Sequence, residues 1–183
     1  MAPKVDRLVL ALVGFSAGVV LLVFGLIIVF VLLYGKTRHP KSKAPGSSLP
    51  WELGWTTAFT VIAVGFFAWG AALFLRAHSA PPGSIVIYGI GKQWMWKFQH
   101  QSGRQELDEL HVPLGTPVRL VLVSQDVIHS FFVPAFRLKQ DVLPGRYSEL
   151  DFTATRPGEY VLFCSQYCGL SHARMTGKVV VLP

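Results

Sequence analysis

The sequence predicts two membrane-spanning α-helices in a hairpin, followed by an all-β sandwich domain. Two long uncharged runs predict the helices, in a chain of 183 residues that is 51% hydrophobic and has a mean hydropathy of +0.44. This composition is too apolar for an ordinary soluble domain. Short segments rich in β-branched and aromatic residues, separated by turn-forming clusters, predict the sandwich. We place the boundary between the helical hairpin, residues 1–78, and the outer domain, residues 79–183, at a Pro- and Gly-rich linker.

The two uncharged runs extend over Leu8–Tyr34 and Leu53–Leu75. At a rise of about 1.5 Å per residue, each run is long enough to cross a hydrocarbon core of about 30 Å. The first run is longer than the roughly 7–15 apolar residues of a cleaved secretory signal, and no small-residue cleavage site follows it. We therefore expect it to be a retained helix.

The distribution of charge predicts the orientation. The loop between the runs contains Lys36, Arg38, Lys41 and Lys43 and no acidic residue. The positive-inside rule places this loop in the cytoplasm, and both termini and the outer domain on the periplasmic side of a bacterial-type inner membrane. Ten Lys/Arg and eight Asp/Glu follow residue 76, which leaves the outer domain +2 of the chain's +7 charge. This distribution does not resemble a nucleic-acid-binding surface.

The outer domain is predicted to contain short strands with no helical period between them, which is typical of a β-sandwich or barrel. We expect strands at Ser84–Tyr88, Gln93–Phe98, Pro117–Ser124, Ser130–Val133, Tyr147–Phe152, Glu159–Phe163 and Lys178–Leu182. Alternation within the second segment would place Trp94 and Trp96 on one face. The polar stretch flanked by His100 and His111 is expected to be irregular.

The chain has two cysteines, and both belong to a C-x3-C-x3-H-x2-M motif formed by Cys164, Cys168, His172 and Met175. A disulfide would explain the cysteines but not the histidine and methionine. Thiolate, thioether and imidazole groups all suit copper. Zinc is a weaker candidate because a thioether is an unusual zinc ligand. The motif therefore favours copper, with His129 as a further candidate ligand, although a single histidine is more often structural.

Together with the segments 126–130 and 138–146, this motif resembles subunit II of cytochrome c oxidases. The resemblance covers almost the whole chain and implies a cupredoxin-like domain with a dinuclear copper centre (CuA) of two copper ions. It implies that Cys164 and Cys168 bridge both ions. It also implies that His129 and Met175 complete one copper, and that His172 and the backbone carbonyl of Gln166 complete the other.

The same resemblance assigns roles to two further residues. Trp94, in the segment 93–96, matches the family's tryptophan at which electrons enter. The alternative is that Trp94 and Trp96 are strand residues that pack in the core or against the membrane surface. Glu52 matches a glutamate at the mouth of a proton channel, but a carboxylate at a helix start is also favoured by the helix dipole. For Glu52 the two interpretations are equally well supported, and both can hold.

The sequence departs from the family pattern at two places. Many members have glutamate where this chain has Gln166, and they use its carboxylate for a magnesium ion shared with the catalytic subunit. A neutral amide is a poorer ligand for a hard cation, so magnesium binding is left open here. The outer domain is also close to neutral, whereas the usual docking surface for a basic cytochrome c is acidic, so steering of a basic donor is expected to be weak.

The resemblance implies a subunit of a proton-translocating oxidoreductase that passes electrons to haem in a partner, where oxygen is reduced to water. The expected partners are the haem-bearing catalytic subunit I, other oxidase subunits, a c-type cytochrome or equivalent donor, and membrane lipid, without nucleic acid. Two other protein classes compete with this interpretation. A quinol oxidase subunit would have lost the copper ligands, and a copper chaperone or thiol–disulfide protein would need a thioredoxin-like αβ pattern.

Overall fold

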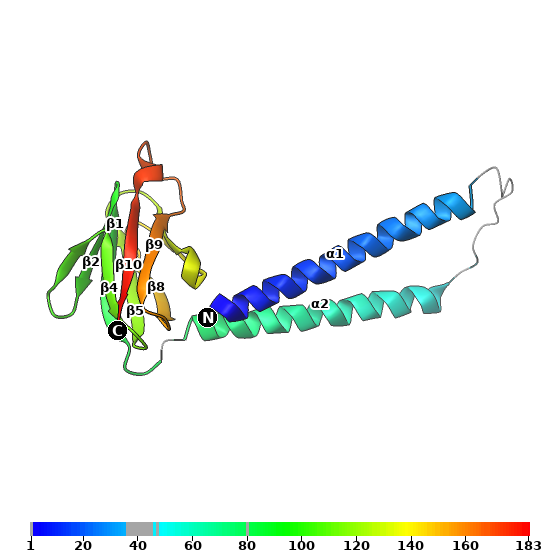
Figure 1. Cartoon of the computed structure of the whole chain (residues 1–183), viewed down its shortest axis with the longest axis horizontal. Helices are drawn as coiled ribbons and strands as arrows, with labels where there is room; N and C mark the ends of the chain where they lie inside the picture. Colours follow the sequence, from blue (N-terminus) through cyan, green and yellow to red (C-terminus); the bar gives the residue numbers. More distant parts are fainter. Residues whose placement is uncertain (1, 36–45, 47, 80) are drawn as a thin grey trace. The chain divides into compact units, whose positions relative to one another are not determined.

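The computed structural model of the chain describes residues 2–35, 46, 48–79 and 81–183. The basic residues Lys36, Arg38, Lys41 and Lys43 lie outside the described residues, so the predicted orientation in the membrane stays a prediction. The described residues form two compact units, one from Pro3 to Leu73 and one that contains Phe74–Pro183 (Figure 1). The domain boundary predicted between residues 78 and 79 likewise stays a prediction.

The first unit consists of helices α1 (Ala2–Leu33) and most of α2 (Leu49–Ala77). Both are long and apolar enough to cross a membrane. Nearly all of their large apolar side chains are exposed, as expected of helices whose surroundings are lipid. The ring of Phe15 packs against Phe59 and Phe66, with centroids 6.2 Å and 5.6 Å apart, so the two helices contact each other.

Both helices begin earlier than the uncharged runs predicted. Pro3 is accommodated because the first turn of a helix needs no backbone donor at that position. Glu52 lies in the first turn of α2, where Ser48 Oγ donates a hydrogen bond of 3.0 Å to its carboxylate and Glu52 N–H donates to the Ser48 carbonyl. These polar residues belong to the helix, but the uncharged run in the sequence marked only its apolar part.

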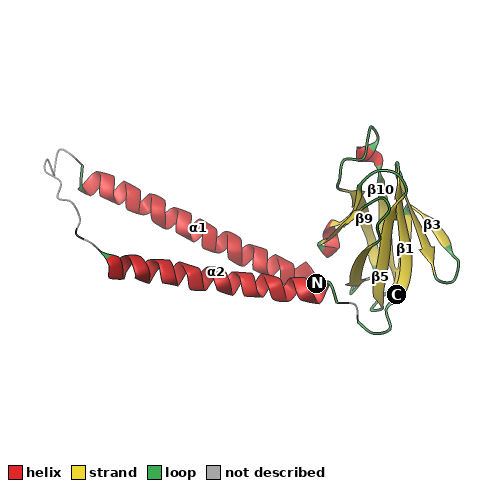
Figure 2. Cartoon of the chain, turned by 180° about the vertical axis from the view of Figure 1, so that it is seen from behind, coloured by secondary structure: helices red, strands yellow, loops and turns green. Residues whose placement is uncertain are grey.

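The outer domain is a sandwich of two mixed sheets, which confirms the predicted fold class (Figure 2). One sheet has the order β3-β2-β1-β5-β8 and the other the order β4-β10-β9-β6-β7. The strands are β1 (Ile85–Lys92), β2 (Met95–His100), β3 (Gln105–Leu107), β4 (Glu109–Pro113), β5 (Pro117–Ser124), β6 (His129–Val133), β7 (Leu138–Val142), β8 (Ser148–Thr153), β9 (Gly158–Cys164) and β10 (Thr176–Leu182). The pairs β1–β5 and β4–β10 are parallel, and the other pairs are antiparallel.

The core lies between the two sheets and is dominated by aromatic rings. Trp96 and Phe98 of β2 both meet Phe131 of β6 edge to face, with centroids 5.7 Å and 6.2 Å apart, so these rings join the two sheets. Gly89 of β1 makes room for this core, because a Cβ there would lie 2.6 Å from the Leu122 side chain. The loops that contain the candidate ligands are therefore attached to a closely packed scaffold.

Three strands were not predicted. The stretch after His100 is not irregular, as had been expected: it forms β3 and β4, in which Leu110 and Val112 are buried. The alternation was hidden because Glu106, a carboxylate, occupies a buried position of β3. Strand β7 was also missed, because polar residues occupy three of its five positions.

The expectation that Trp94 and Trp96 share a strand face was wrong. Strand β1 continues to Lys92 and β2 begins only at Met95, so Gln93 and Trp94 form the turn between them. Trp96 is fully buried, whereas Trp94 is 37% exposed. The antiparallel pairing of Lys92 with Met95 leaves these two residues in the connection, which removes Trp94 from the alternation.

Candidate metal centre

The candidate ligands lie at the ends of two neighbouring strands of one sheet and in the loop between β9 and β10. His129 begins β6, Cys164 ends β9, and Phe131 pairs with Cys164 across the antiparallel β6–β9 ladder. The short helix η2 (His172–Arg174) follows the loop after β9, and Met175 directly precedes β10. Because Cys164 N–H donates to the Met175 carbonyl at 3.1 Å, the loop returns to the point where it began.

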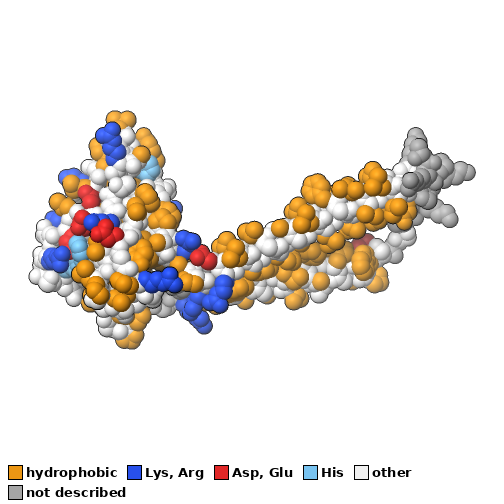
Figure 3. Space-filling view, in the orientation of Figure 1, with side chains coloured by type: hydrophobic (Ala, Val, Ile, Leu, Met, Phe, Trp, Pro, Cys, Tyr) orange, Lys and Arg blue, Asp and Glu red, His pale blue; other side chains and the backbone are white. Residues whose placement is uncertain are grey.

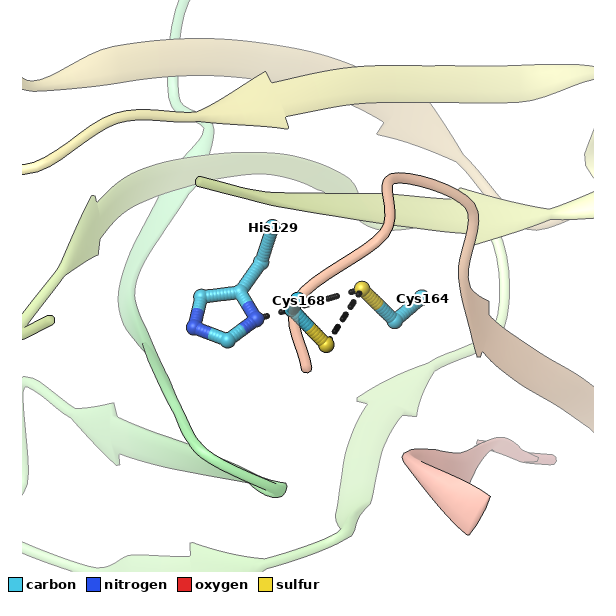
Figure 4. A group of neighbouring side chains, drawn as sticks. All are labelled: His129, Cys164 and Cys168. Atoms are coloured by element: carbon cyan, nitrogen blue, oxygen red, sulfur yellow. Dashed lines mark hydrogen bonds between the residues drawn. The ribbon is translucent and has the colours of Figure 1, made fainter. Parts of the chain in front are cut away.

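His129, Cys164 and Cys168 form the centre of the site, and all three are buried (Figure 4). Their ligand atoms all lie within 4.8 Å of one another. His129 Nδ1 faces Cys164 Sγ at 3.9 Å, and the two sulfur atoms are 3.8 Å apart as free thiols. A covalent S–S bond is about 2.05 Å long, so the cysteines are arranged around a space rather than bonded to each other.

The other three predicted donors surround the same two sulfur atoms. His172 Nδ1 lies 3.4 Å from Cys168 Sγ, and Met175 Sδ lies 3.8 Å from it. The Gln166 carbonyl oxygen lies 3.2 Å from Cys164 Sγ. The structure thus gathers two thiols, two imidazoles, a thioether and a carbonyl at one end of the sandwich.

A carboxylate that was not among the predicted site residues orients one of these groups. Asp126 Oδ1 lies 2.7 Å from His129 Nε2 and also accepts the Val127 N–H at 2.7 Å, while Oδ2 accepts the Gln93 N–H at 2.7 Å. With Nε2 engaged, Nδ1 is the nitrogen that faces the sulfur atoms. A carboxylate behind a histidine is the usual arrangement for a metal ligand, because it fixes the tautomer and the ring orientation. The Asp-x-x-His spacing is the feature of the sequence from which this pair could have been predicted.

Charge in the site favours a bound cation. Burial raises the pKa of the Cys164 thiol, but hydrogen bonds with His129, Ser130, Gln166 and Cys168 together outweigh this and lower the pKa to about 6. Burial and the neighbouring Cys164 thiolate raise the pKa of Cys168 to about 12. Burial alone would also raise the pKa of Asp126, yet the hydrogen bonds from Gln93, His129 and Val127 hold it below its ordinary value. A metal ion would neutralise this buried negative charge and allow the second thiol to ionise.

The donor set fits copper better than zinc. The thioether of Met175 is fully buried beside Cys168 Sγ and is a poor partner for zinc. Soft sulfur donors combined with imidazole suit copper. The residues present therefore fit the copper that the sequence motif predicted.

Gln93 and Trp94 hold the backbone of the ligand loop from outside. Gln93 Nε2 donates a hydrogen bond of 2.7 Å to the Cys168 carbonyl, and Trp94 Nε1 donates one of 3.2 Å to the same oxygen. Gly169 permits this approach: its φ is +118°, and a Cβ there would lie 2.9 Å from Gln93 Nε2 and 3.2 Å from the Trp94 ring. Trp94 is thereby connected to a candidate ligand through one hydrogen bond.

His100 and His111, which flank the stretch that was expected to be irregular, both contact another group. Both lie 3.1 Å from the carboxylate of Glu106, which also accepts the His111 N–H and pairs with Arg104 at 2.8 Å. This cluster joins β2, β3 and β4 away from the sulfur atoms. Glu52, the remaining candidate, is in the first turn of α2 and thus in the helical unit.

Comparison with known proteins gives consistent matches. Residues 103–182 match the model of the family described as cytochrome c oxidase subunit II, periplasmic domain. The chain is 40% identical over 111 residues to cytochrome c oxidase subunit 2 of Synechocystis, and 42% identical over 97 residues to that of Thermostichus vulcanus. These alignments cover 61% and 53% of this chain but only 33% and 29% of those relatives, so the chain spans about a third of their length.

A solved structure shares both sequence and fold with the outer domain. The periplasmic domain of subunit II of cytochrome oxidase from Bradyrhizobium japonicum is 30% identical, with a TM-score of 0.54. The match covers 57% of this chain and 88% of that structure.

Proposed function

This chain belongs to the family of cytochrome c oxidase subunit II, and from that premise we propose that it is the electron-accepting subunit of a haem–copper terminal oxidase. The observation that supports this role is the convergence of four further copper-type donors on two buried thiols, next to an exposed tryptophan. Two copper ions bound there would supply a one-electron carrier whose charge is shared through the bridging thiolates. The receiving haem and the oxygen chemistry would belong to the catalytic subunit I.

In this proposal the residues of the chain hold and shield the centre. Cys164 and Cys168 would hold the two ions through their thiolates, together with His129, Met175, His172 and the backbone carbonyl of Gln166. His129 and Cys164 lie in paired strands, and the loop that contains the other ligands is fixed by backbone hydrogen bonds, so a change of charge need not move them. Trp94 would receive the electron, because its indole N–H bonds directly to the Cys168 carbonyl.

The proposal extends to the membrane part and to magnesium. Helices α1 and α2 would anchor the chain in a bacterial-type inner membrane with the outer domain in the periplasm. Glu52 would then lie at the cytoplasmic start of α2, where a proton channel into the partner could open. Gln166 would contribute only its carbonyl, to copper, because its neutral side chain is a poor magnesium ligand.

Two alternatives are less well supported. The thiol–disulfide protein would need a thioredoxin-like fold, whereas the two cysteines lie in a β-sandwich. The copper-free quinol oxidase subunit would not need the donor groups that gather around Cys164 and Cys168. The oxidase subunit with copper therefore explains the site best.

An electron paramagnetic resonance spectrum with a copper count tests the proposal. The full chain in neutral detergent, reduced and loaded with copper, is expected to bind two ions that share one unpaired electron, seen as a seven-line hyperfine pattern. Cys164→Ser should abolish this pattern. Met175→Leu should keep it and shift the reduction potential, and Tyr167→Phe, in the same loop, is the control that should change neither. A four-line spectrum from one copper, or no binding after full reduction, would contradict the proposal.

A further inference from the structure

The end of the outer domain that contains the candidate copper site has an exposed apolar rim. We define the rim as Trp94, Met95, Val127, Ile128, Tyr167 and Leu170. Tyr167 is 76% exposed and Leu170 is 95% exposed. A group of exposed apolar side chains marks a surface that binds a partner.

Contacts between the loops show that the rim is continuous. Trp94 bonds to the Cys168 carbonyl and packs over Gly169, directly before Leu170. Gln93 N–H bonds to the Asp126 carboxylate, which also accepts the Val127 N–H, so the turn that contains Trp94 lies beside the loop that contains Val127 and Ile128. The Tyr167 ring lies 5.8 Å from that of His172. The rim therefore lies directly over the candidate ligands.

The charged residues beside the rim are cationic. Lys92 is next to Gly91, which packs on the His129 ring. Arg174 directly precedes the candidate ligand Met175. Both side chains are exposed, and neither is within salt-bridge distance of a carboxylate in the described part of the chain. On the face drawn in Figure 3, apolar and basic side chains gather at the tip where Figure 1 draws the loop before β10.

The carboxylates of the outer domain, in contrast, already have partners. Glu109 and Glu159 both pair with Lys178, and Glu149 and Asp151 both pair with Arg119. Glu106 pairs with Arg104 and two histidines, and Asp141 pairs with Lys139. Asp126 faces inward to His129, and Asp108 accepts a hydrogen bond from the Trp96 N–H. The acidic groups therefore do not form a free surface that could attract a basic protein.

We propose that the rim receives a one-electron carrier protein whose docking face is apolar at its centre and bears carboxylates at its edge. This inference rests on the proposed function, because the step is the transfer of one electron: the carrier is oxidised by one electron and the copper centre is reduced by one. Apolar contact with Leu170 and Tyr167 would supply most of the affinity, and Lys92 and Arg174 would orient the carrier. A strongly basic cytochrome c is the wrong partner for this surface.

Binding and electron transfer from two probes of opposite charge test the proposal. The full chain in neutral detergent, loaded with copper, is titrated by calorimetry with an acidic c-type cytochrome and with a strongly basic cytochrome c of similar potential. Reduction of the copper centre is followed by stopped flow. The ionic strength is raised from about 0.01 M to about 1 M, which shortens the Debye length from about 30 Å to about 3 Å.

The acidic probe is expected to bind more tightly than the basic one and to lose affinity as salt rises. The double variant Lys92→Glu/Arg174→Glu should weaken binding of the acidic probe roughly tenfold at low salt, with the difference vanishing at high salt. Arg156→Glu is the matched control, since Arg156 lies beyond the opposite end of β9 from Cys164, and it should have less than a twofold effect. Leu170→Ser should weaken the binding of both probes at every salt concentration.

Tighter binding of the basic probe, with a loss on adding salt, would overturn the inference. So would a double variant that binds both probes as the wild type does. A double variant that fails to assemble into the oxidase, while donor affinity is unchanged, would identify the rim as a subunit interface and also overturn it. The proposed function fails separately: in that case the copper spectrum is absent, or a small uncharged reductant cannot reduce the centre.

Discussion

Replacement of Asp126 by asparagine tests how the carboxylate behind His129 supports the metal site. Oδ1 lies 2.7 Å from His129 Nε2 and accepts the Val127 N–H, while Oδ2 accepts the Gln93 N–H. An amide offers one oxygen and one NH2 group. Either orientation of Asp126→Asn therefore places a donor against a donor, and the orientation that retains His129 leaves the Gln93 N–H without its partner.

The expected losses of free energy of unfolding and of copper affinity follow from these hydrogen bonds. The Gln93 N–H is exposed, so water can replace the lost carboxylate. The copper-free protein should therefore lose only the net value of a hydrogen bond, about 0.5–1.5 kcal/mol of free energy of unfolding. Loss of a carboxylate behind a ligating histidine typically lowers metal affinity about 10–100-fold, which corresponds to about 1.4–2.8 kcal/mol of binding free energy. The geometry of the ligand atoms should survive, because Cys164, Cys168 and Met175 do not bond to this carboxylate.

The assay is copper affinity by competition with a chelator, together with urea unfolding of the copper-free chain. Asp151→Asn is the control, since this carboxylate pairs with Arg119 on β5 and faces away from the site. We expect Asp126→Asn to lose copper affinity and Asp151→Asn to keep it. Equal copper affinity in the two variants would refute the role assigned to Asp126, and a loss of stability alone would show that the carboxylate only supports the turn.

Two further predictions concern the scaffold. Gly91→Ala should destabilise the chain by about 1–3 kcal/mol, because the added Cβ would lie 2.9 Å from the buried His129 ring; it should also alter the copper spectrum, whereas Gly89→Ala should destabilise without altering it. For Glu106, burial raises the pKa but hydrogen bonds and charges from His111, His100 and Arg104 outweigh it, so the folded pKa lies below 4.5. The ionised Glu106 side chain therefore stabilises the fold fully above about pH 4.5, and this stabilisation is lost as the pH falls through the lower folded pKa. Urea unfolding of wild type and Glu106→Gln should show a difference in stability that shrinks in acid and not in base.

Much of the architecture could be predicted from the sequence. The two helices were visible because lipid-facing segments must be apolar without interruption, and that property is written in consecutive residues. Strand β5 was predicted with its observed bounds because its alternating residues are buried and partly buried in turn. The ligand motif at Cys164, Cys168, His172 and Met175 was visible because four donors occupy one short loop.

Other features depended on pairing between distant segments. Strand β3 and the buried Glu106 cluster were missed because a carboxylate can occupy a core position only when histidines from other strands reach it. Trp94 is exposed because of the register in which β1 pairs with β2, and the local sequence pattern does not determine this register.

The sequence by itself determined the membrane helices, the β class of the outer domain and the soft-donor motif, since each depends on local composition or spacing. Only the tertiary structure decided which nitrogen of His129 faces the thiols, because that choice is made by Asp126 across a loop. It also decided that Gln93 and Trp94 hold the Cys168 carbonyl, and that Lys92 and Arg174 flank one apolar rim. These relations join residues far apart in the chain, and they exist only once the strands are paired.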